Sequence, residues 1–91
     1  MTHFFAQDKL VWAAAGGRKM AVDYTIAELE QKLDPRRFLR IHRATLLNLE
    51  RVDEVAPWFA GGLAVKVKDP AGTQLQVSQD RARVLKEWLG F

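Results

Sequence analysis

The sequence predicts a mainly β domain with two short helices. Apolar and polar residues alternate in several short runs, as at residues 63–68, which is the pattern of a half-buried strand. Turn residues separate these runs: Gly16-Gly17 supplies the positive φ angles of a tight hairpin, and the DPAG sequence at residues 69–72 suits a type I turn. Helix signals occur in two segments, 25–34 and 78–90.

The first extended segments predict an antiparallel meander. Residues 4–5 and 10–14 are apolar and flank the polar residues 7–9. After the glycine turn, the alternation of residues 19–24 predicts a return strand.

The first helix is predicted to begin at Thr25. Its hydroxyl can accept a hydrogen bond from a free backbone N–H, while Glu28, three residues later, reaches back to complete a capping box. Asp34-Pro35 ends the helix, because proline disfavours helical conformation in the residue before it. The apolar stripe of this helix consists of Ile26, Leu29 and Leu33.

The second half predicts further strands and a closing helix. Residues 38–41 look extended, and residues 44–49 fit either a tight turn or a short strand. Residues 52–59 and 63–68 predict a strand pair, and the next strand directs Leu75 and Val77 to the core.

The closing helix is predicted to begin at the cap Ser78 and to end at Gly90. Asp80 favours the positive end of the helix. The apolar stripe consists of Ala82, Leu85, Trp88 and Leu89.

Composition indicates one globular domain over residues 1–91. Of the 91 residues, 48% are hydrophobic and 27% are charged, which allows a modest core. Cysteine is absent, so a disulfide framework and a thiolate metal site are excluded. No apolar run reaches the length of a membrane span, and the start does not resemble a signal peptide. We therefore expect no membrane association and a cytoplasmic location.

Positive charge is concentrated in one segment. The net charge is +3, and residues 35–43 contain Arg36, Arg37, Arg40 and Arg43 but no carboxylate. This distribution is expected of a surface that contacts phosphates. A solvated arginine-rich edge explains it equally well.

Enzymatic chemistry finds little support. Ser78 is the only serine, and no nucleophile motif surrounds it. His3 and His42 are far apart in the sequence and lack zinc-ligand spacing. His42 fits a hydrogen-bonded, half-buried histidine better than a general base. We therefore expect no catalysis, no metal and no cofactor.

Two common modes of nucleic-acid binding are also disfavoured. Trp12, Trp58 and Trp88 do not interleave with the arginines, so core packing explains them better than stacking on single strands. A helix-turn-helix needs two helices joined by a short turn, whereas these two helices are separated by about half of the domain. DNA would have to be contacted by loops or strand ends.

The segment FLRIHRATLLNL at residues 38–49 resembles the signature F-x-R-x-H-R-S-x-x-V-N of LytTR DNA-binding domains. Residues 5–11, 25–33 and 77–78 with the closing helix are similar, in order, to the flanking parts of that family. The resemblance implies an elongated stack of small antiparallel β-sheets. It also implies that irregular segments enter successive major grooves of duplex DNA.

The resemblance implies a set of base-contacting residues. Arg43 can donate two hydrogen bonds to guanine, and Gln79 suits adenine. Without the resemblance, Asp8 and Lys9 fit a solvated turn pair. The implied base contacts are Gln7, Asp8, Lys9, Arg43 and Gln79.

Further residues are assigned to phosphates or to the scaffold. Arg40 is equally compatible with a phosphate contact and with a structural ion pair. The implied phosphate contacts are Arg36, Arg37, Arg40 and Arg81. The residues expected to support the site are His42, Asn48 and Ser78.

The chain departs from the family pattern at three positions. Gln79 stands where many members have arginine, which removes a charge and a guanine-binding group. Ala44 replaces the usual serine and loses its hydroxyl, while Leu47 replaces valine at an expected core position.

The resemblance also implies a biological setting. We expect a domain excised from, or forming the C-terminal part of, a longer bacterial two-component response regulator with a phospho-receiver domain. Pairs of subunits would bind direct repeats on double-stranded DNA and regulate transcription. The alternatives are an all-β module for RNA or single strands, and a protein-interaction domain with an incidental basic edge.

Overall fold

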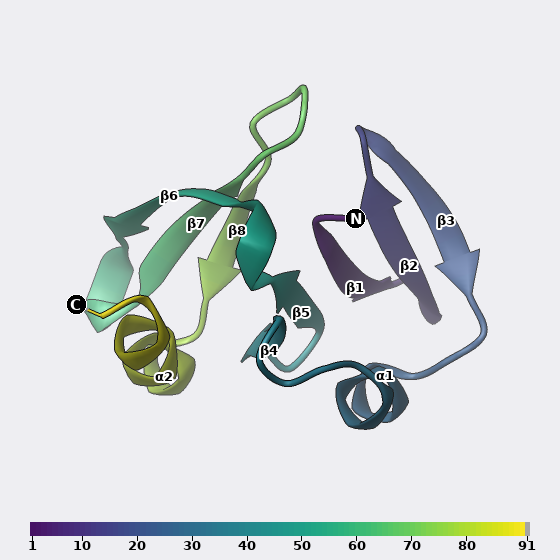
Figure 1. Ribbon diagram of the computed structural model, residues 1–91, viewed down its shortest axis with the longest axis horizontal. Helices are drawn as coiled ribbons and strands as arrows, with labels where there is room; N and C mark the ends of the chain where they lie inside the picture. The colour runs from purple at the N-terminus through teal and green to yellow at the C-terminus, as the bar shows by residue number, and fades with distance from the viewer. Residues whose placement is uncertain (91) are drawn as a thin grey trace.

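The computed structural model describes residues 1–90, apart from the side chain of Phe59. Its strands form two antiparallel sheets, one with the order β3-β2-β1-β5-β4 and one with the order β6-β7-β8 (Figure 1). The strands of the first sheet are β1 (His3–Gln7), β2 (Leu10–Ala15), β3 (Arg18–Val22), β4 (Phe38–His42) and β5 (Thr45–Asn48). Those of the second are β6 (Val52–Pro57), β7 (Leu63–Val67) and β8 (Gln74–Val77).

Two α-helices and two 3-10 helices accompany the strands within residues 1–90. Helix α1 spans Ile26–Lys32 and helix α2 spans Gln79–Leu89, while the turns η1 and η2 span Leu49–Arg51 and Phe59–Gly61. In Figure 1 both helices lie along the lower edge, with β4 and β5 between them. The predicted mainly β fold with two helices is confirmed, and residues 45–48 form a strand. Neither helix within residues 1–90 is long and apolar enough to cross a membrane.

Both turns of the first meander adopt left-handed backbone conformations. Gly16 and Gly17 have φ angles of 57° and 80°, as expected of the predicted hairpin. Asp8 and Lys9, which join β1 to β2, also have positive φ angles, 53° and 65°. Such angles are uncommon for residues with a side chain, and Asp tolerates them better than Lys. The two-residue turn projects from the paired ends Gln7 and Leu10.

The predicted capping box begins α1. The Thr25 hydroxyl accepts a hydrogen bond from the Glu28 N–H (3.0 Å), and the Glu28 carboxylate accepts one from the Thr25 N–H (2.9 Å). These two hydrogen bonds, the backbone one first, lower the pKa of Glu28 because they stabilise its ionised form. The helix ends at Leu33, whose extended backbone precedes Asp34 and Pro35.

Substitution of Thr25 by alanine should destabilise the domain by about 1 kcal/mol, the usual loss for a helix cap. The change is measured as a lower urea midpoint. DNA affinity at a temperature where both proteins are folded should be unchanged, because the Thr25 hydroxyl is engaged by the Glu28 N–H and the buried Ile26 and Leu29 keep α1 in place. An unchanged midpoint would show that the capping box contributes nothing.

Strand β5 is buried on both faces. Leu47 (0% exposed) packs with Val65, Val77 and Leu85 in a core formed by β4, β5, the second sheet and α2. Its neighbour Leu46 (1% exposed) packs in a second core beneath α1. The residues of this second core are Phe4, Ala13, Ile26, Leu29 and Leu46. Because successive side chains of a strand point to opposite faces, β5 separates two cores and holds them together.

Helix α2 is tied to β4 at its first turn. Ser78 occupies the predicted cap position, but its side chain forms no cap hydrogen bond, contrary to the prediction. The Ser78 N–H (2.9 Å) and hydroxyl (3.4 Å) instead both lie within hydrogen-bonding distance of the Ile41 carbonyl. The far end follows the prediction, since Gly90 closes the helix with a φ of 78°.

Core packing was the wrong expectation for two of the tryptophans. Trp58 and Trp88 are 42% and 44% exposed. At about 100° per residue, Trp88 lies about 60° round the helix from Leu85 on the side away from Ala82, so it falls outside the buried face. Trp58 follows the end of β6, beyond the sheet. Trp12 is half-buried, and the Lys19 ammonium lies 4.5 Å from its ring centre.

Candidate nucleic-acid interface

The turn between β4 and β5 presents Arg43 to solvent. His42 is half-buried, and its Nδ1 accepts a hydrogen bond from the Ala44 N–H (3.3 Å). The Ala44 carbonyl accepts one from the Ala6 N–H of β1 (2.9 Å). His42 is thus the hydrogen-bonded, half-buried histidine that the sequence predicts. Within residues 1–90, the exposed Arg43 guanidinium has no hydrogen-bond or ion-pair partner.

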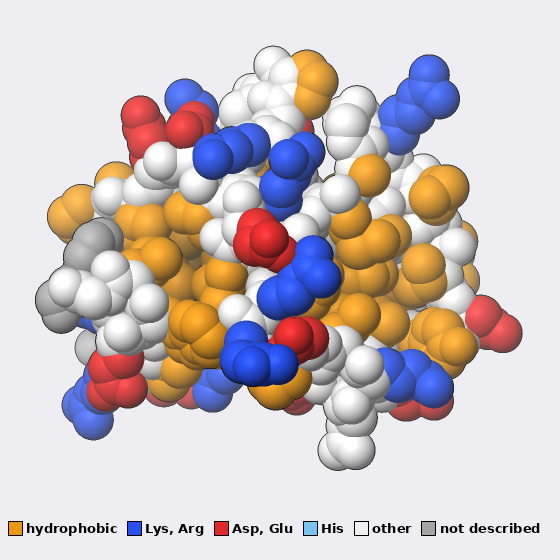
Figure 2. Space-filling model, in the orientation of Figure 1, with side chains coloured by type: hydrophobic (Ala, Val, Ile, Leu, Met, Phe, Trp, Pro, Cys, Tyr) orange, Lys and Arg blue, Asp and Glu red, His pale blue; other side chains and the backbone are white. Residues whose placement is uncertain are grey.

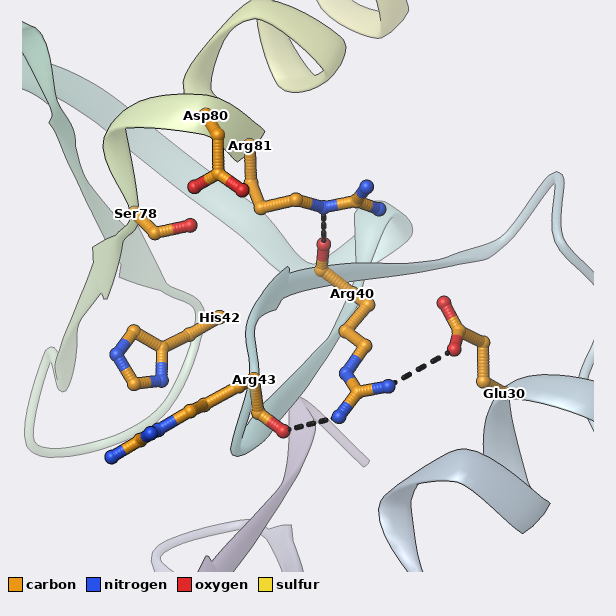
Figure 3. A pocket seen from close by; sticks show the side chains of 7 residues that line it. All are labelled: Glu30, Arg40, His42, Arg43, Ser78, Asp80 and Arg81. Carbon is orange, nitrogen blue, oxygen red and sulfur yellow. Dashed lines mark hydrogen bonds and ion pairs between the residues drawn. The ribbon is translucent and has the colours of Figure 1, made fainter.

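Arg40 bridges α1 and this turn. Its Nη1 lies 3.3 Å from the Glu30 carboxylate, and its Nη2 donates to the Arg43 carbonyl at 2.6 Å (Figure 3). The Arg40 side chain is 29% exposed, and its buried Nε has no partner within residues 1–90. The sequence left open whether Arg40 forms a phosphate contact or an ion pair, and the geometry favours the ion pair.

The start of α2 borders the same region as α1 and the β4–β5 turn. The Arg81 Nε donates to the Arg40 carbonyl (2.7 Å), so Arg81 links the helix to β4. The Ser78 hydroxyl, followed by backbone N–H groups and Arg81, lowers the pKa of Asp80. Asp80 is therefore ionised at neutral pH and places a negative charge beside the arginines.

These residues line an open hollow of about 620 Å³, here called the arginine hollow. Figure 3 shows its side chains converging from α1, the β4–β5 turn and the start of α2. Arginines outnumber carboxylates, so the hollow has a small positive excess. The lining residues are Glu30, Arg40, His42, Arg43, Ser78, Asp80 and Arg81.

The β1–β2 turn lies beside the arginine hollow. Lys9 lines an adjoining hollow together with Arg40 and Arg43, and Gln7 lines another together with His42. The structure therefore brings Gln7 and Lys9 close to the turn of Arg43. Asp8 lies between them at the tip and lines neither of these hollows.

Gln79 is exposed but turns away from the arginine hollow. Its Nε2 lies 3.5 Å from the position that a Cβ on Gly61 would occupy, beside η2. It belongs to the same end of α2 as Arg81, yet it faces a different part of the surface.

The basic run of residues 35–43 is divided in two. Arg36 and Arg37 precede β4, whereas Arg43 follows it, so about 20 Å of extended chain separates Arg37 from Arg43. Arg36 pairs with Asp34, and Arg37 pairs with Glu50. The run forms no continuous patch, and its first two charges are partly neutralised.

Asn48 lies at the end of β5 that is remote from Arg43. Its side-chain amide donates to the Met1 carbonyl (2.8 Å), and its side-chain oxygen accepts from the Glu50 N–H (3.0 Å). The residue is 7% exposed and satisfies backbone groups as predicted. It supports the fold and does not line the arginine hollow.

The face shown in Figure 2 gathers charge along its middle. Lys, Arg, Asp and Glu side chains form a column between two hydrophobic areas that lie over β1–β3 and β6–β8. Positive and negative side chains alternate in this column. This face therefore carries both signs of charge and is not uniformly basic.

Sequence reasoning did not assign Glu30 and Asp80 to the site. Asp80 had a local signal, because a carboxylate two residues after a serine cap can reach the hydroxyl. Glu30 had none, since its partner Arg40 is brought to it by the packing of α1 against the sheet.

The histidines do not build a metal centre. His3 is 5% exposed, bonded to Thr2 (2.7 Å), and burial lowers its pKa despite the opposing charge of Asp69. His3 and His42 line one hollow. Within residues 1–90, however, no group of three or more His, Asp or Glu side chains could hold a metal ion.

Comparison with known proteins identifies the family. Residues 2–90 match the model of the LytTr DNA-binding domain. The chain belongs to the LytTR family. This family consists of DNA-binding domains and not of enzymes.

Relatives of this LytTR domain include regulators from several bacteria. Sensory transduction protein LytT of Oceanobacillus iheyensis is 31% identical over 88 residues, which cover 86% of this chain and 36% of that protein. LytT of Bacillus subtilis is 35% identical over 68 residues, which cover 75% and 27%. Transcriptional regulatory protein YpdB of Escherichia coli K12 is 26% identical over 82 residues, which cover 90% and 33%. The chain thus spans about a third of the length of these curated relatives.

The predicted LytTR fold is confirmed by a solved structure. The LytTR DNA-binding domain of a methyl-accepting/DNA response regulator from Bacillus cereus superposes with a TM-score of 0.88 at 24% identity. The match covers 99% of this chain and 81% of that one.

Proposed function

We propose that this LytTR domain binds duplex DNA in a sequence-specific manner and thereby regulates transcription. The proposal rests on three segments that converge on the arginine hollow and on the adjoining hollow that Lys9 lines. The β1–β2 turn brings Lys9, the β4–β5 turn brings Arg43, and the start of α2 brings Arg81. Within residues 1–90 the two α-helices are not joined by a short turn, so DNA has to be contacted by loops and strand ends, and those at this edge suit insertion into a major groove.

Arg43 is the principal base reader in this proposal. Its guanidinium is exposed and has no partner within residues 1–90, and its turn is fixed by hydrogen bonds to β1 and to His42. A guanidinium in this state can donate two hydrogen bonds to guanine O6 and N7. Gln7, Asp8 and Lys9 contact bases from the neighbouring turn. Gln79 contacts a base farther along the groove, on the side of η2.

Phosphate contacts set the affinity and the register on DNA. Arg81 contributes from the rim of the arginine hollow, while Arg36 and Arg37 contribute from the opposite end of β4. Each of the latter two must exchange a carboxylate partner for a phosphate. Arg40 has both amino nitrogens occupied and contributes chiefly through structure.

In its cellular setting, the domain acts in the cytoplasm as the DNA-binding part of a longer two-component regulator. The relatives named for sensory transduction or transcriptional regulation are about three times its length, which leaves room for a receiver domain. Pairs of subunits on direct repeats complete the proposal, since one domain of this size covers a short site.

Duplexes selected from a random pool by this chain provide the test. We expect the selected duplex to outcompete a scrambled duplex, its separate strands and the corresponding RNA. With roughly three to five phosphate contacts, log K against log salt should slope by about −3 to −4.5. A preference for RNA or single strands would support the alternative nucleic-acid module. A flat salt response or no binding would support a protein-interaction domain.

A further inference from the structure

We propose that Glu30 is a positioning residue that determines sequence discrimination through Arg40 and Arg43. The inference rests on the proposed function, in which Arg43 reads a base. Glu30 holds the Arg40 guanidinium, and that guanidinium holds the backbone of the Arg43 turn (Figure 3). Glu30 itself contacts no base.

The geometry fixes the Arg40 guanidinium at two ends. Nη1 lies 3.3 Å from the Glu30 carboxylate, and Nη2 lies 2.6 Å from the Arg43 carbonyl oxygen. The Arg40 carbonyl is held in turn by the Arg81 Nε (2.7 Å). Because a guanidinium is planar, immobilising both amino groups also orients the group between them. The carbonyl of Arg43 is thereby anchored while its side chain remains free for DNA.

Glu30 has a firm support for this role. Helix α1 is short, but Ile26 and Leu29 are each 5% exposed and anchor it in the second core. The carboxylate therefore projects from a fixed element. The contacts of Arg40 thus connect α1 to Arg43, the proposed base reader.

The positioning role accounts for the Glu30 carboxylate on a surface that is proposed to bind DNA. A negative charge near phosphates weakens binding to every duplex. A turn held in its binding conformation loses less conformational entropy on association, however. Glu30 would thus weaken binding to all duplexes and increase the preference for the selected duplex over a scrambled one.

The test compares Glu30→Ala with Glu50→Ala. Each variant removes one negative charge and one exposed ion pair with arginine, but Glu50 pairs with Arg37 at the remote end of β4. Affinities are measured for the duplex selected by the wild-type chain and for a scrambled duplex of equal composition. We expect Glu30→Ala to lower the selected-to-scrambled ratio by about two- to tenfold. Glu50→Ala should leave the ratio unchanged.

Two further variants separate positioning from charge. Glu30→Gln keeps an oxygen that accepts a hydrogen bond from Arg40, so it should retain more discrimination than Glu30→Ala. Arg40→Lys keeps the positive charge but replaces the planar bridge by a single ammonium, so the ratio should fall. Thermal melting confirms that each variant is folded at the temperature of the assay.

A double variant distinguishes the positioning role of Glu30 from base reading by Arg43. In the Arg43→Ala background, Glu30→Ala should cause no further loss of discrimination, because its effect passes through Arg43. If Arg43→Ala lowers the ratio while Glu30→Ala does not, the positioning role is overturned and base reading by Arg43 stands. If Arg43→Ala leaves the ratio unchanged, the assigned base reader is wrong, and the positioning role fails with it.

Discussion

Replacement of Arg43 by alanine should weaken binding to the selected duplex by roughly 1–3 kcal/mol and relax discrimination at one guanine. The side chain has no partner to lose within residues 1–90, so the change removes DNA contacts and leaves the fold intact. Affinities for the selected duplex and for single base-pair variants of it measure the effect.

Arg37→Ala is the matched control. Arg37 pairs with Glu50 at the remote end of β4, and a phosphate contact from that position carries no base information. Its loss should reduce affinity for all duplexes by similar factors. If Arg43→Ala also reduced selected and scrambled affinities equally, Arg43 would be a backbone contact, and base reading would fall to residues 7–9 and Gln79.

Substitution of Leu47 by alanine should destabilise the domain by about 2–5 kcal/mol, because it opens a cavity in a packed core. Leu47 is 0% exposed and contacts the core shared by both sheets and α2. Urea unfolding measures the change. Loss of this contact should weaken the attachment of the second sheet to β4 and β5.

Leu10→Ala provides the corresponding surface control. Leu10 is 49% exposed, and such a substitution should change stability by no more than about 0.5 kcal/mol. A loss of unfolding free energy below about 1 kcal/mol for Leu47→Ala would contradict the two-core architecture, because truncating a fully buried leucine costs more than that.

Local chemistry made most elements predictable. The glycines at 16–17, the capping box of Thr25 and Glu28, and the turn at residues 69–72 each act within a few residues. The turn hydrogen bond from the Gly72 N–H to the Asp69 carbonyl follows that expectation. The signature around His42 likewise located the turn of Arg43, because the His42–Ala44 contact spans two residues.

Contacts between distant segments were not predictable in the same way. The pairing of β1 with β5 and the bridge from Arg40 to Glu30 depend on packing across the sheet. The arginine run is divided because β4 lies within it. Arg36 and Arg37 precede the strand, and Arg43 follows it. Trp88 is exposed because it lies off the buried face of α2, and Trp58 because it follows the end of β6.

The burial of β5 on both faces has a consequence for how DNA specificity can change. With both of its faces committed to cores, β5 can offer a groove only its ends and the turn that precedes it. The tips bear exposed residues, such as Arg43, whose replacement seldom alters stability by more than about 0.5 kcal/mol. The buried frame and the exposed side chains that are proposed to read DNA are thus largely separate sets of residues. We therefore expect single substitutions at the tips to change the preferred DNA sequence without compensating changes in the interior.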